Sequence, residues 1–354
     1  MTNNYKIAVF AGDGIGPEVT QEALRVLDVT AELAGFTVDC KHFPHGSEHY
    51  LATGELLPDD VLEEVRGMDA VYLGAIGDPR VEVGLVERAV IAGLRFGLDL
   101  YVNLRPIRLM AEKFCPLKGK TARDIDFVVV RENTEDAYAG IGGILKKGTD
   151  NEVAMQQMVY TRQGVERVIR YAFETARKRD RQKKLLLVDK ANAIRAQDIW
   201  TRTFAEVGEE YPDIEREHAY VDAACMWMVK NPESFDTVVT TNLFGDIITD
   251  LGAVLQGGMG VAASGNINPG KVSLFEPIHG SAPKYKGQNV SCPIAAIAAV
   301  YMMLDELGQT SSAAKIEQAI EKVLSSEDVT SVSASSGIST SEWGDRVIEA
   351  LRQL

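Results

Sequence analysis

Short apolar runs alternate with stretches of helical periodicity in the N-terminal part of the chain. Runs rich in β-branched and aromatic residues, which are typical of strands, occupy 6–11, 36–43 and 69–77. Helical patterns fill the intervening stretches at 17–35 and 58–68, and a proline opens the first of them. A strand, a helix and a second strand make the βαβ unit of parallel sheets. The pattern therefore predicts an α/β protein.

The same alternation returns further along the chain. Strand candidates lie at 126–132, 184–190 and 235–241, and each precedes a helical or loop segment. The C-terminal stretch has helical patterns, including 293–307 and 312–324. Single cores stop growing at roughly 250–300 residues, and the chain has 354. We therefore expect two lobes that share one continuous α/β architecture.

Glycines divide the stretch 138–160 into two runs of alternating apolar and polar residues. Two such runs, joined by a loop that contains glycine, are typical of a β-hairpin. We expect this hairpin to form an arm that embraces a partner subunit.

The composition fits a soluble enzyme and excludes several other classes of protein. Acidic residues outnumber basic ones by 51 to 37, and the net charge of −14 argues against a nucleic-acid-binding groove. No apolar run approaches the roughly 18 residues of a membrane-spanning helix. The N-terminus runs into a strand and lacks a secretory signal, so we expect a cytoplasmic protein. The four cysteines lack metal-binding spacing, which favours reduced thiols.

The glycine-rich segment GDGIGPE at 12–18 lies between the first predicted strand and the first predicted helix. Glycines at this place bind pyrophosphate in dinucleotide-binding proteins, but there the spacing is G-x-G-x-x-G. Here the spacing is G-x-G-x-G, and Asp13 within the turn would repel a phosphate. The segment therefore favours a tight strand-to-helix turn over a dinucleotide fingerprint.

Three arginines and a tyrosine lie at or near the ends of predicted elements. Arg95 is on a helical pattern, Arg105 ends an extended run before a proline, and Arg131 ends a strand candidate. Tyr138 follows seven residues after Arg131. Because guanidinium groups bind carboxylates through two parallel hydrogen bonds, this set favours a pocket for a di- or tricarboxylate.

The stretch NLFGDIITD places Asp246 and Asp250 four residues apart on a predicted helix. Like charges at this spacing repel by roughly 3 kcal/mol at an effective dielectric of about 20. No basic residue lies between 231 and 270, so their counter-charge must come from elsewhere in the fold or from solution.

A lysine and a third aspartate end two other predicted strands, Lys190 the strand 184–190 and Asp222 the strand after it. Ligands of open α/β sheets bind at the carboxyl ends of the strands, which favours a joint site. Asp222, Asp246 and Asp250 together offer only oxygen donors, a set that suits Mg²⁺ or Mn²⁺. An ordinary ion pair between Lys190 and Asp222 is the alternative.

Seven motifs in order resemble the β-decarboxylating dehydrogenases, the isocitrate and 3-isopropylmalate dehydrogenase family. They are GDGIGPE, LRPIRL, VVVRENTEDAY, DKAN, VDAA, TNLFGDIITDLGA and FEPIHGSAPKYKGQ. The resemblance implies a two-lobed α/β fold that is not a Rossmann fold. One lobe, 1–100 with 257–354, would bind the cofactor, and 101–256 would bind substrate and form a homodimer with shared active sites, its arm lying near 138–160.

The resemblance also implies roles for the candidate residues. Arg95, Arg105 and Arg131 would hold the malate moiety of the substrate. Asp246 and Asp250, with Asp222 from the partner subunit, would bind the metal, while Tyr138, Lys190 and Asp222 would handle protons. The reaction implied is a metal-assisted, nicotinamide-dependent oxidation of a 2-hydroxy acid with loss of CO₂.

The residues before Arg95 bear on the choice of substrate. Isocitrate enzymes of the family carry a serine and an asparagine where this chain has Ala89 and Ile91. The apolar pair Val90 and Ile91 suits an isopropyl group, because an apolar wall would leave a carboxylate without partners. We therefore expect 3-isopropylmalate, the substrate of leucine biosynthesis. Isocitrate, homoisocitrate and malate or tartrate stay as alternatives, since VRENTEDAYAG resembles the isocitrate branch.

The segment FEPIHGSAPKYKGQ resembles the adenosine site of the family. The candidate cofactor-binding residues are Glu276, His279, Gly280, Ser281, Ala282, Lys284 and Tyr285. Lys284 and Tyr285 resemble the pair that recognises the 2′-phosphate of NADP. The tyrosine and arginine that complete that grip near the C-terminus are Ser326 and Thr330 here. We expect NAD, with NADP as the alternative.

Overall fold

The computed structural model describes residues 3–354, and the chain forms two compact units. Unit 1 comprises 1–100, 106–125 and 253–354, and unit 2 comprises 101–105 and 126–252. The division expected from the sequence placed 106–125 and 253–256 with the middle of the chain, whereas their contacts place them in unit 1. Strand β4 (Val102–Arg108) and helix α9 (Asn242–Leu255) each pass from one unit to the other.

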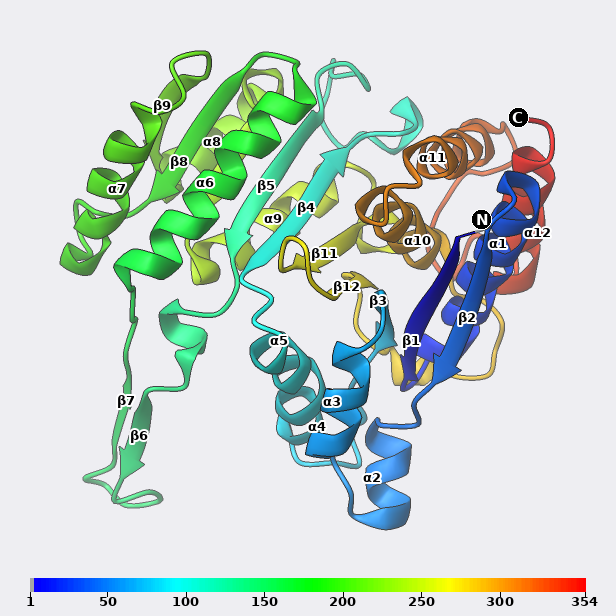
Figure 1. Ribbon diagram of the computed structural model, residues 1–354, viewed down its shortest axis with the longest axis horizontal. Helices are drawn as coiled ribbons and strands as arrows, with labels where there is room; N and C mark the ends of the chain where they lie inside the picture. The colour runs from blue at the N-terminus through cyan, green and yellow to red at the C-terminus, as the bar shows by residue number, and fades with distance from the viewer. Residues whose placement is uncertain (1–2) are drawn as a thin grey trace. The chain divides into compact units, whose positions relative to one another are not determined.

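The strands of unit 1 follow the spatial order β2, β1, β3, β12, β11. Their bounds are β1 (Asn4–Gly12), β2 (Thr37–His42), β3 (Ala70–Ala75), β11 (Ala263–Ile267) and β12 (Ser273–Pro277). All neighbours are parallel except β11 and β12, which are antiparallel. The first three strands and the helices between them are the βαβ units that the N-terminal pattern predicts (Figure 1).

One buried helix of unit 1, α10 (Ile294–Glu306), packs on α1, α11 and β12. Its run of alanine, isoleucine, valine and methionine is apolar on all sides, which is the pattern of a fully enclosed helix. The other helices are α1 (Gly16–Ala34), α2 (Ser47–Thr53), α3 (Asp59–Arg66), α4 (Leu85–Glu87), α5 (Gly93–Gly97), α11 (Thr310–Ser325) and α12 (Thr340–Leu351). A π-helical segment, Arg88–Ala92, joins α4 to α5.

The carboxylate of Asp13 joins three segments of unit 1. It is 2% exposed and accepts hydrogen bonds from Ser47 N (2.8 Å), Ser47 Oγ (2.7 Å) and Gly77 N (2.8 Å). The neighbouring Gly14 has φ +58°, and a Cβ there would lie 1.9 Å from the carbonyl oxygen of Ser281. The glycine-rich segment is therefore a tight turn in which the carboxylate of Asp13 is bound within the protein.

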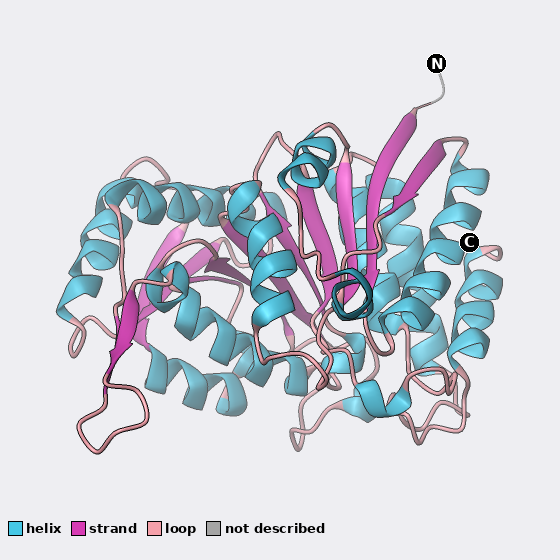
Figure 2. Cartoon of the chain, turned by 90° about the horizontal axis from the view of Figure 1, so that it is seen from below, coloured by secondary structure: helices cyan, strands magenta, loops and turns pink. Residues whose placement is uncertain are grey.

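The strands of unit 2 follow the order β5, β10, β8, β9, and all of them are parallel. Their bounds are β5 (Asp126–Glu132), β8 (Lys184–Asp189), β9 (Glu215–Tyr220) and β10 (Thr237–Thr240). The helices α6 (Arg162–Arg179), α7 (Asp198–Gly208) and α8 (Val221–Lys230) complete the unit, and Figure 2 separates helices from strands by colour. β5, β8 and β10 are buried almost throughout, as expected for strands covered on both faces.

A separate two-stranded antiparallel hairpin, β6 (Gly142–Leu145) and β7 (Val153–Gln156), confirms the predicted arm as a structural element (Figures 1 and 2). Every residue of both strands is exposed, including apolar side chains. These are Ile144 (51%), Leu145 (57%), Val153 (46%) and Met155 (54%). An isolated two-stranded hairpin is marginally stable in water, so this arm lacks a core of its own.

No helix among the described residues is both long and apolar enough to span a membrane.

Candidate active site

The parallel strands of unit 2 bring four of the candidate residues to one edge. Arg131 lies near the end of β5, and Asp246 lies in α9, which follows β10. Lys190 follows β8 directly, and Asp222 lies in the first turn of α8, which follows β9. Because these strands are parallel, their carboxyl ends meet at the edge where ligands of open α/β sheets bind.

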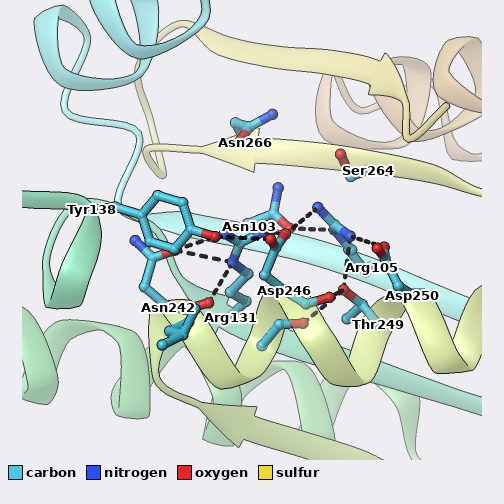
Figure 3. Close-up of polar contacts among 12 residues, drawn as sticks. Asn103, Arg105, Arg131, Tyr138, Asn242, Asp246, Thr249, Asp250, Ser264 and Asn266 are labelled. Carbon is cyan, nitrogen blue, oxygen red and sulfur yellow. Dashed lines mark hydrogen bonds and ion pairs between the residues drawn. The ribbon is translucent and has the colours of Figure 1, made fainter. Parts of the chain in front are cut away.

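Arg131 is buried, with 2% exposure, and its guanidinium is fixed by two residues of α9 (Figure 3). Nε donates to the carbonyl oxygen of Asn242 (2.9 Å), and Nη2 donates to Asn242 Oδ1 (2.7 Å). Nη1 donates to Asp246 Oδ1 at 2.5 Å. A buried charge needs an ionic partner and hydrogen bonds, and Asp246 and Asn242 supply both.

Asp246 connects the candidate tyrosine to the candidate arginines. Its Oδ2 accepts a hydrogen bond from the hydroxyl of Tyr138 at 2.8 Å. The guanidinium carbon of Arg131 lies 5.4 Å from the centre of the Tyr138 ring, which is within cation–π distance. Tyr138 is 39% exposed, so its hydroxyl is held in place at the surface.

Arg105 lies against both aspartates of the α9 pair. Its Nη2 is 3.6 Å from Asp246 Oδ1, and its Nη1 is 3.5 Å from Asp250 Oδ1. Hydrogen bonds to Asn103 Oδ1 (2.7 Å) and Thr249 Oγ1 (2.7 Å) orient the guanidinium. Two arginines from other elements thus supply the counter-charge that the i, i+4 pair requires. The side chain of Asp250 is 63% exposed.

Lys190 and Asp222 form a second charged pair in unit 2. Lys190 Nζ donates to Asp222 Oδ1 at 2.5 Å, and this hydrogen bond holds the pKa of the Asp222 carboxyl below its usual value. The Lys190 ammonium also lies 5.7 Å from the centre of the Tyr220 ring. Within one chain, the described carboxylates of Asp222, Asp246 and Asp250 do not form a three-donor cluster.

Four of the candidate cofactor residues of unit 1 line a pocket of about 620 Å³, namely Gly280, Ser281, Ala282 and Lys284. Much of the remaining lining comes from the segment after β3 and from α4, through Ile76, Gly77, Asp78, Pro79, Val81, Val83 and Glu87. Sequence reasoning missed these residues, although the glycine and proline that follow a buried strand are a usable signal of a ligand-binding loop.

Two further candidate residues, Glu276 and His279, precede Gly280 in the chain. Glu276 Oε1 accepts a hydrogen bond from Asn266 Nδ2 at 2.7 Å. Burial lowers the pKa of His279, which favours a neutral ring at pH 7, and its Nε2 has no hydrogen-bond partner among the described residues. A bound ligand can supply the hydrogen bond that this buried nitrogen lacks, so the segment FEPIHGSAPKYKGQ fits a cofactor. Lys284 Nζ lies 4.6 Å from the centre of the Tyr285 ring.

The remaining candidates lie around the π-helical segment of unit 1. Val90 is 1% exposed and belongs to the hydrophobic core, whereas Ile91 is partly exposed and packs against that core. Arg95 lies in the last turn of α5. Of the two apolar residues, Ile91 is therefore the one whose side chain is accessible to a substrate.

The sequence profile described as isocitrate/isopropylmalate dehydrogenase matches residues 6–347. This chain belongs to the isocitrate/isopropylmalate dehydrogenase family. It is 49% identical to the 3-isopropylmalate dehydrogenase of Thermobifida fusca over 98% of both chains. It is also 49% identical to that of Mycobacterium avium, over 98% of this chain and 100% of the relative. The crystal structure of isocitrate dehydrogenase from Methylococcus capsulatus superposes with a TM-score of 0.88 at 37% identity, covering 99% of this chain and 100% of that one.

Membership of the isocitrate/isopropylmalate dehydrogenase family confirms the resemblance read from the seven motifs. It also confirms the prediction of an α/β fold of this family, and of a decarboxylating dehydrogenase that acts on a hydroxy acid.

Three residues that orient the arginines of this dehydrogenase were not singled out by sequence reasoning. Asn103 lies two positions before Arg105 on β4, so both side chains project from the same face of the strand. Asn242 and Thr249 lie within the same NLFGDIITD stretch as the two aspartates. A polar residue at i−2 of a strand arginine is a signal that would have found Asn103.

Proposed function

We propose that this protein catalyses the NAD-dependent oxidative decarboxylation of 3-isopropylmalate to 2-oxo-4-methylpentanoate, a step of leucine biosynthesis, with Mg²⁺ or Mn²⁺. The observation that carries the proposal is the array in which Arg105 and Arg131 face Asp246 and Asp250. Guanidinium groups recognise the carboxylates of a malate, and the aspartates supply oxygen donors for a divalent ion. Relatives named 3-isopropylmalate dehydrogenase, at 49% identity over nearly the whole chain, support this choice.

Substrate recognition would rest on Arg95, Arg105 and Arg131 for the two carboxylates and on Ile91, with Val90 behind it, for the isopropyl group. Arg105 and Arg131 are already oriented by hydrogen bonds to Asn103 and Asn242. Little conformational freedom is therefore lost when a carboxylate binds to them. Isocitrate is the alternative substrate, because the chain is 37% identical to an isocitrate dehydrogenase of known structure.

The metal would be held by Asp246 and Asp250 together with Asp222 of the partner subunit. All three donors are carboxylates, and the side chains of Asp222 (68%) and Asp250 (63%) are well exposed, so they fit a hard divalent ion. When bound, Mg²⁺ or Mn²⁺ polarises the hydroxyl and carboxylate oxygens of the substrate and stabilises the negative charge that develops there.

Proton transfer would involve Lys190 and Tyr138. The partner's Lys190, paired with Asp222, would accept the proton of the substrate hydroxyl as the neutral amine and become the ammonium. Asp222 stays ionised beside Lys190 and thereby orients its amine. Tyr138 would return a proton to the substrate carbon after CO₂ leaves, and its hydroxyl is both exposed and oriented by Asp246.

The cofactor would bind to the lobe made of 1–100 and 257–354, at Glu276, His279, Gly280, Ser281, Ala282, Lys284 and Tyr285. The unpartnered His279 Nε2 and the pocket beside Lys284 support this placement. Ser326 and Thr330 carry no positive charge, which favours NAD over a cofactor with an additional phosphate. NADP is the alternative, since the Lys284 ammonium is a suitable phosphate ligand.

A matrix of two substrates and two cofactors tests the proposed reaction. With Mg²⁺ present, 3-isopropylmalate and NAD are expected to give the highest kcat/KM, measured by the absorbance of reduced nicotinamide. An apolar wall lacks partners for the third carboxylate of isocitrate, so we expect isocitrate to be at least about 100-fold poorer. A higher kcat/KM with isocitrate contradicts the role of Ile91. No absorbance change with either cofactor would instead point to a metal-dependent lyase.

A second copy of the chain is the proposed partner. Helix α8 exposes Met226 (70%), Trp227 (44%) and Val229 (45%), and α9 exposes Ile247 (54%). Exposed large apolar side chains on adjacent turns are typical of subunit interfaces. The arm adds four more such side chains from strands that have no core of their own. These helices also carry Asp222, Asp246 and Asp250, so a dimer through this face would supply the partner's metal ligand.

Met226→Glu is expected to convert the dimer into monomers and to abolish activity with them, because a carboxylate would be buried without a partner. Analytical ultracentrifugation measures the mass, and activity is followed across a range of protein concentrations. Leu33→Glu is the matched control, since Leu33 is 56% exposed on α1, and this variant should remain dimeric and active. A dimeric, active Met226→Glu protein would place the interface elsewhere.

A further inference from the structure

Two histidines and a glutamate of unit 1 form a cluster apart from the residues discussed so far. One ring nitrogen each of His45 and His49 and a carboxylate oxygen of Glu55 all lie within 4.8 Å of one another. His45 precedes α2, His49 lies within it, and Glu55 follows it. Two imidazoles and one carboxylate are a donor set that Zn²⁺ binds, with water in the fourth position. The all-oxygen aspartate set of unit 2 is of a different chemical kind.

His45 has the surroundings of a metal ligand rather than of a surface histidine. Its side chain is 6% exposed, and its ring lies near Phe10 and Phe43, with centroids 6.3 and 6.5 Å away. Its Nδ1 is buried and has no hydrogen-bond partner among the described residues. Buried polar groups are nearly always partnered, so this nitrogen requires an explanation, and a bound ion provides one.

His49 and Glu55 are held together by the end of α2. His49 Nε2 lies 2.9 Å from Glu55 Oε2. Thr53 Oγ1 donates to the carbonyl oxygen of His49 (2.8 Å) and accepts from the backbone N–H of Glu55 (3.1 Å). Gly54 reverses the chain with φ +75°, which brings Glu55 back towards the helix. The backbone therefore brings both residues to the same end of α2.

We propose that His45, His49 and Glu55 form a zinc site that holds α2 together with the segments immediately before and after it. Tetrahedral zinc with bonds of about 2.0–2.1 Å needs donor atoms about 3.4 Å apart. The Glu55 side chain is 53% exposed and is free to close the remaining gap. Glu48, on the same helix, accepts hydrogen bonds from Arg80 Nη2 (2.5 Å) and Lys286 Nζ (2.6 Å). Zinc bound here would thus steady two segments that neighbour the cofactor pocket.

Calorimetric titration of the full-length protein with Zn²⁺ tests the site. Millimolar Mg²⁺ is present throughout, so that the aspartate set of unit 2 is occupied. We expect one zinc ion per chain for the unaltered protein, with affinity at least about tenfold lower in His49→Gln and in Glu55→Gln. His42→Gln is the matched control, because His42 is exposed and lies three residues before His45, and it should bind like the unaltered protein.

Substitution with Co²⁺ adds a spectroscopic readout. Tetrahedral Co²⁺ bound by nitrogen absorbs visible light far more strongly than octahedral Co²⁺ bound by oxygen only, so the unaltered protein should show this absorption and His49→Gln should lose it. Circular dichroism tests whether each variant is folded. If His49→Gln does not fold, Glu55→Gln, which changes an exposed side chain, takes its place in the comparison. Zinc binding of equal strength in all four proteins, or none in the presence of Mg²⁺, overturns the proposal.

Discussion

Replacing Lys190 with alanine is expected to lower kcat by about 100- to 10,000-fold, the usual contribution of a positioned acid–base group. Lys190 Nζ lies 2.5 Å from Asp222, and removing the amine leaves Asp222 as a carboxylate with no proton carrier beside it. The side chain of its partner Asp222 is 68% exposed, so loss of the pair should change the free energy of unfolding little. Steady-state kinetics with 3-isopropylmalate and NAD gives kcat and KM separately.

Lys183→Ala is the matched control for Lys190→Ala. The two lysines flank the same strand, β8, at opposite ends, and Lys183 pairs with Asp180 at the surface at 3.0 Å. The same loss of charge there should leave kcat unchanged. If Lys190→Ala turned over at the rate of this control, the proton-transfer role proposed for Lys190 would be wrong.

Replacing Asp246 with asparagine is expected to lower kcat/KM by at least about 1,000-fold, since the metal contributes several kcal/mol to the stabilisation of the transition state. Asparagine keeps the shape of the side chain but removes the charge that Arg105 and Arg131 face. The buried Arg131 loses a charge-assisted hydrogen bond, so the free energy of unfolding should also fall by about 1–3 kcal/mol. Kinetics at rising Mg²⁺ concentration and urea unfolding measure the two effects.

Asp213→Asn is the control for the change of charge. Asp213 pairs with Arg177 at 2.6 Å on the exposed surface of unit 2, where solvent screens an ion pair and leaves it little effect on stability. We expect neither kcat/KM nor the unfolding midpoint to change appreciably. Full activity of Asp246→Asn at ordinary Mg²⁺ concentration would remove Asp246 from the metal site.

Local patterns were sufficient to predict much of the fold. The runs 6–11, 69–77 and 126–132 became β1, β3 and β5, because continuous apolar β-branched runs are what doubly covered strands require. The strands β11 and β12 were missed. Each is five residues long and contains glycine, asparagine or proline. Ser273 of β12 lies opposite Ala70 of β3, which is more than 200 positions earlier in the chain, and no local pattern encodes such a pairing.

In the candidate site, too, the local sequence predicts some features, whereas others depend on how distant segments pack together. The spacing of Asp246 and Asp250 predicted that a counter-charge was needed, because their repulsion follows from helix geometry alone. The source of that charge, Arg105 and Arg131, depends on how β4, β5 and α9 pack, which the sequence does not state. The hydrogen bonds of Asn242 to Arg131 depend on the same packing.

The carboxylate of Asp13 has a consequence for how the pocket of unit 1 receives a ligand. It bonds to Gly77 N, while the backbone N–H of Ile15, two residues away, donates to the carbonyl of Ser281 at 2.8 Å. Gly77 and Ser281 both line the pocket and are thus both anchored to one turn, and Ser281 Oγ also donates to the carbonyl oxygen of Gly77 at 2.6 Å. Moving these two segments apart would break these hydrogen bonds. The lining is therefore preorganised, and the nucleotide proposed to bind there would have little loop entropy to remove.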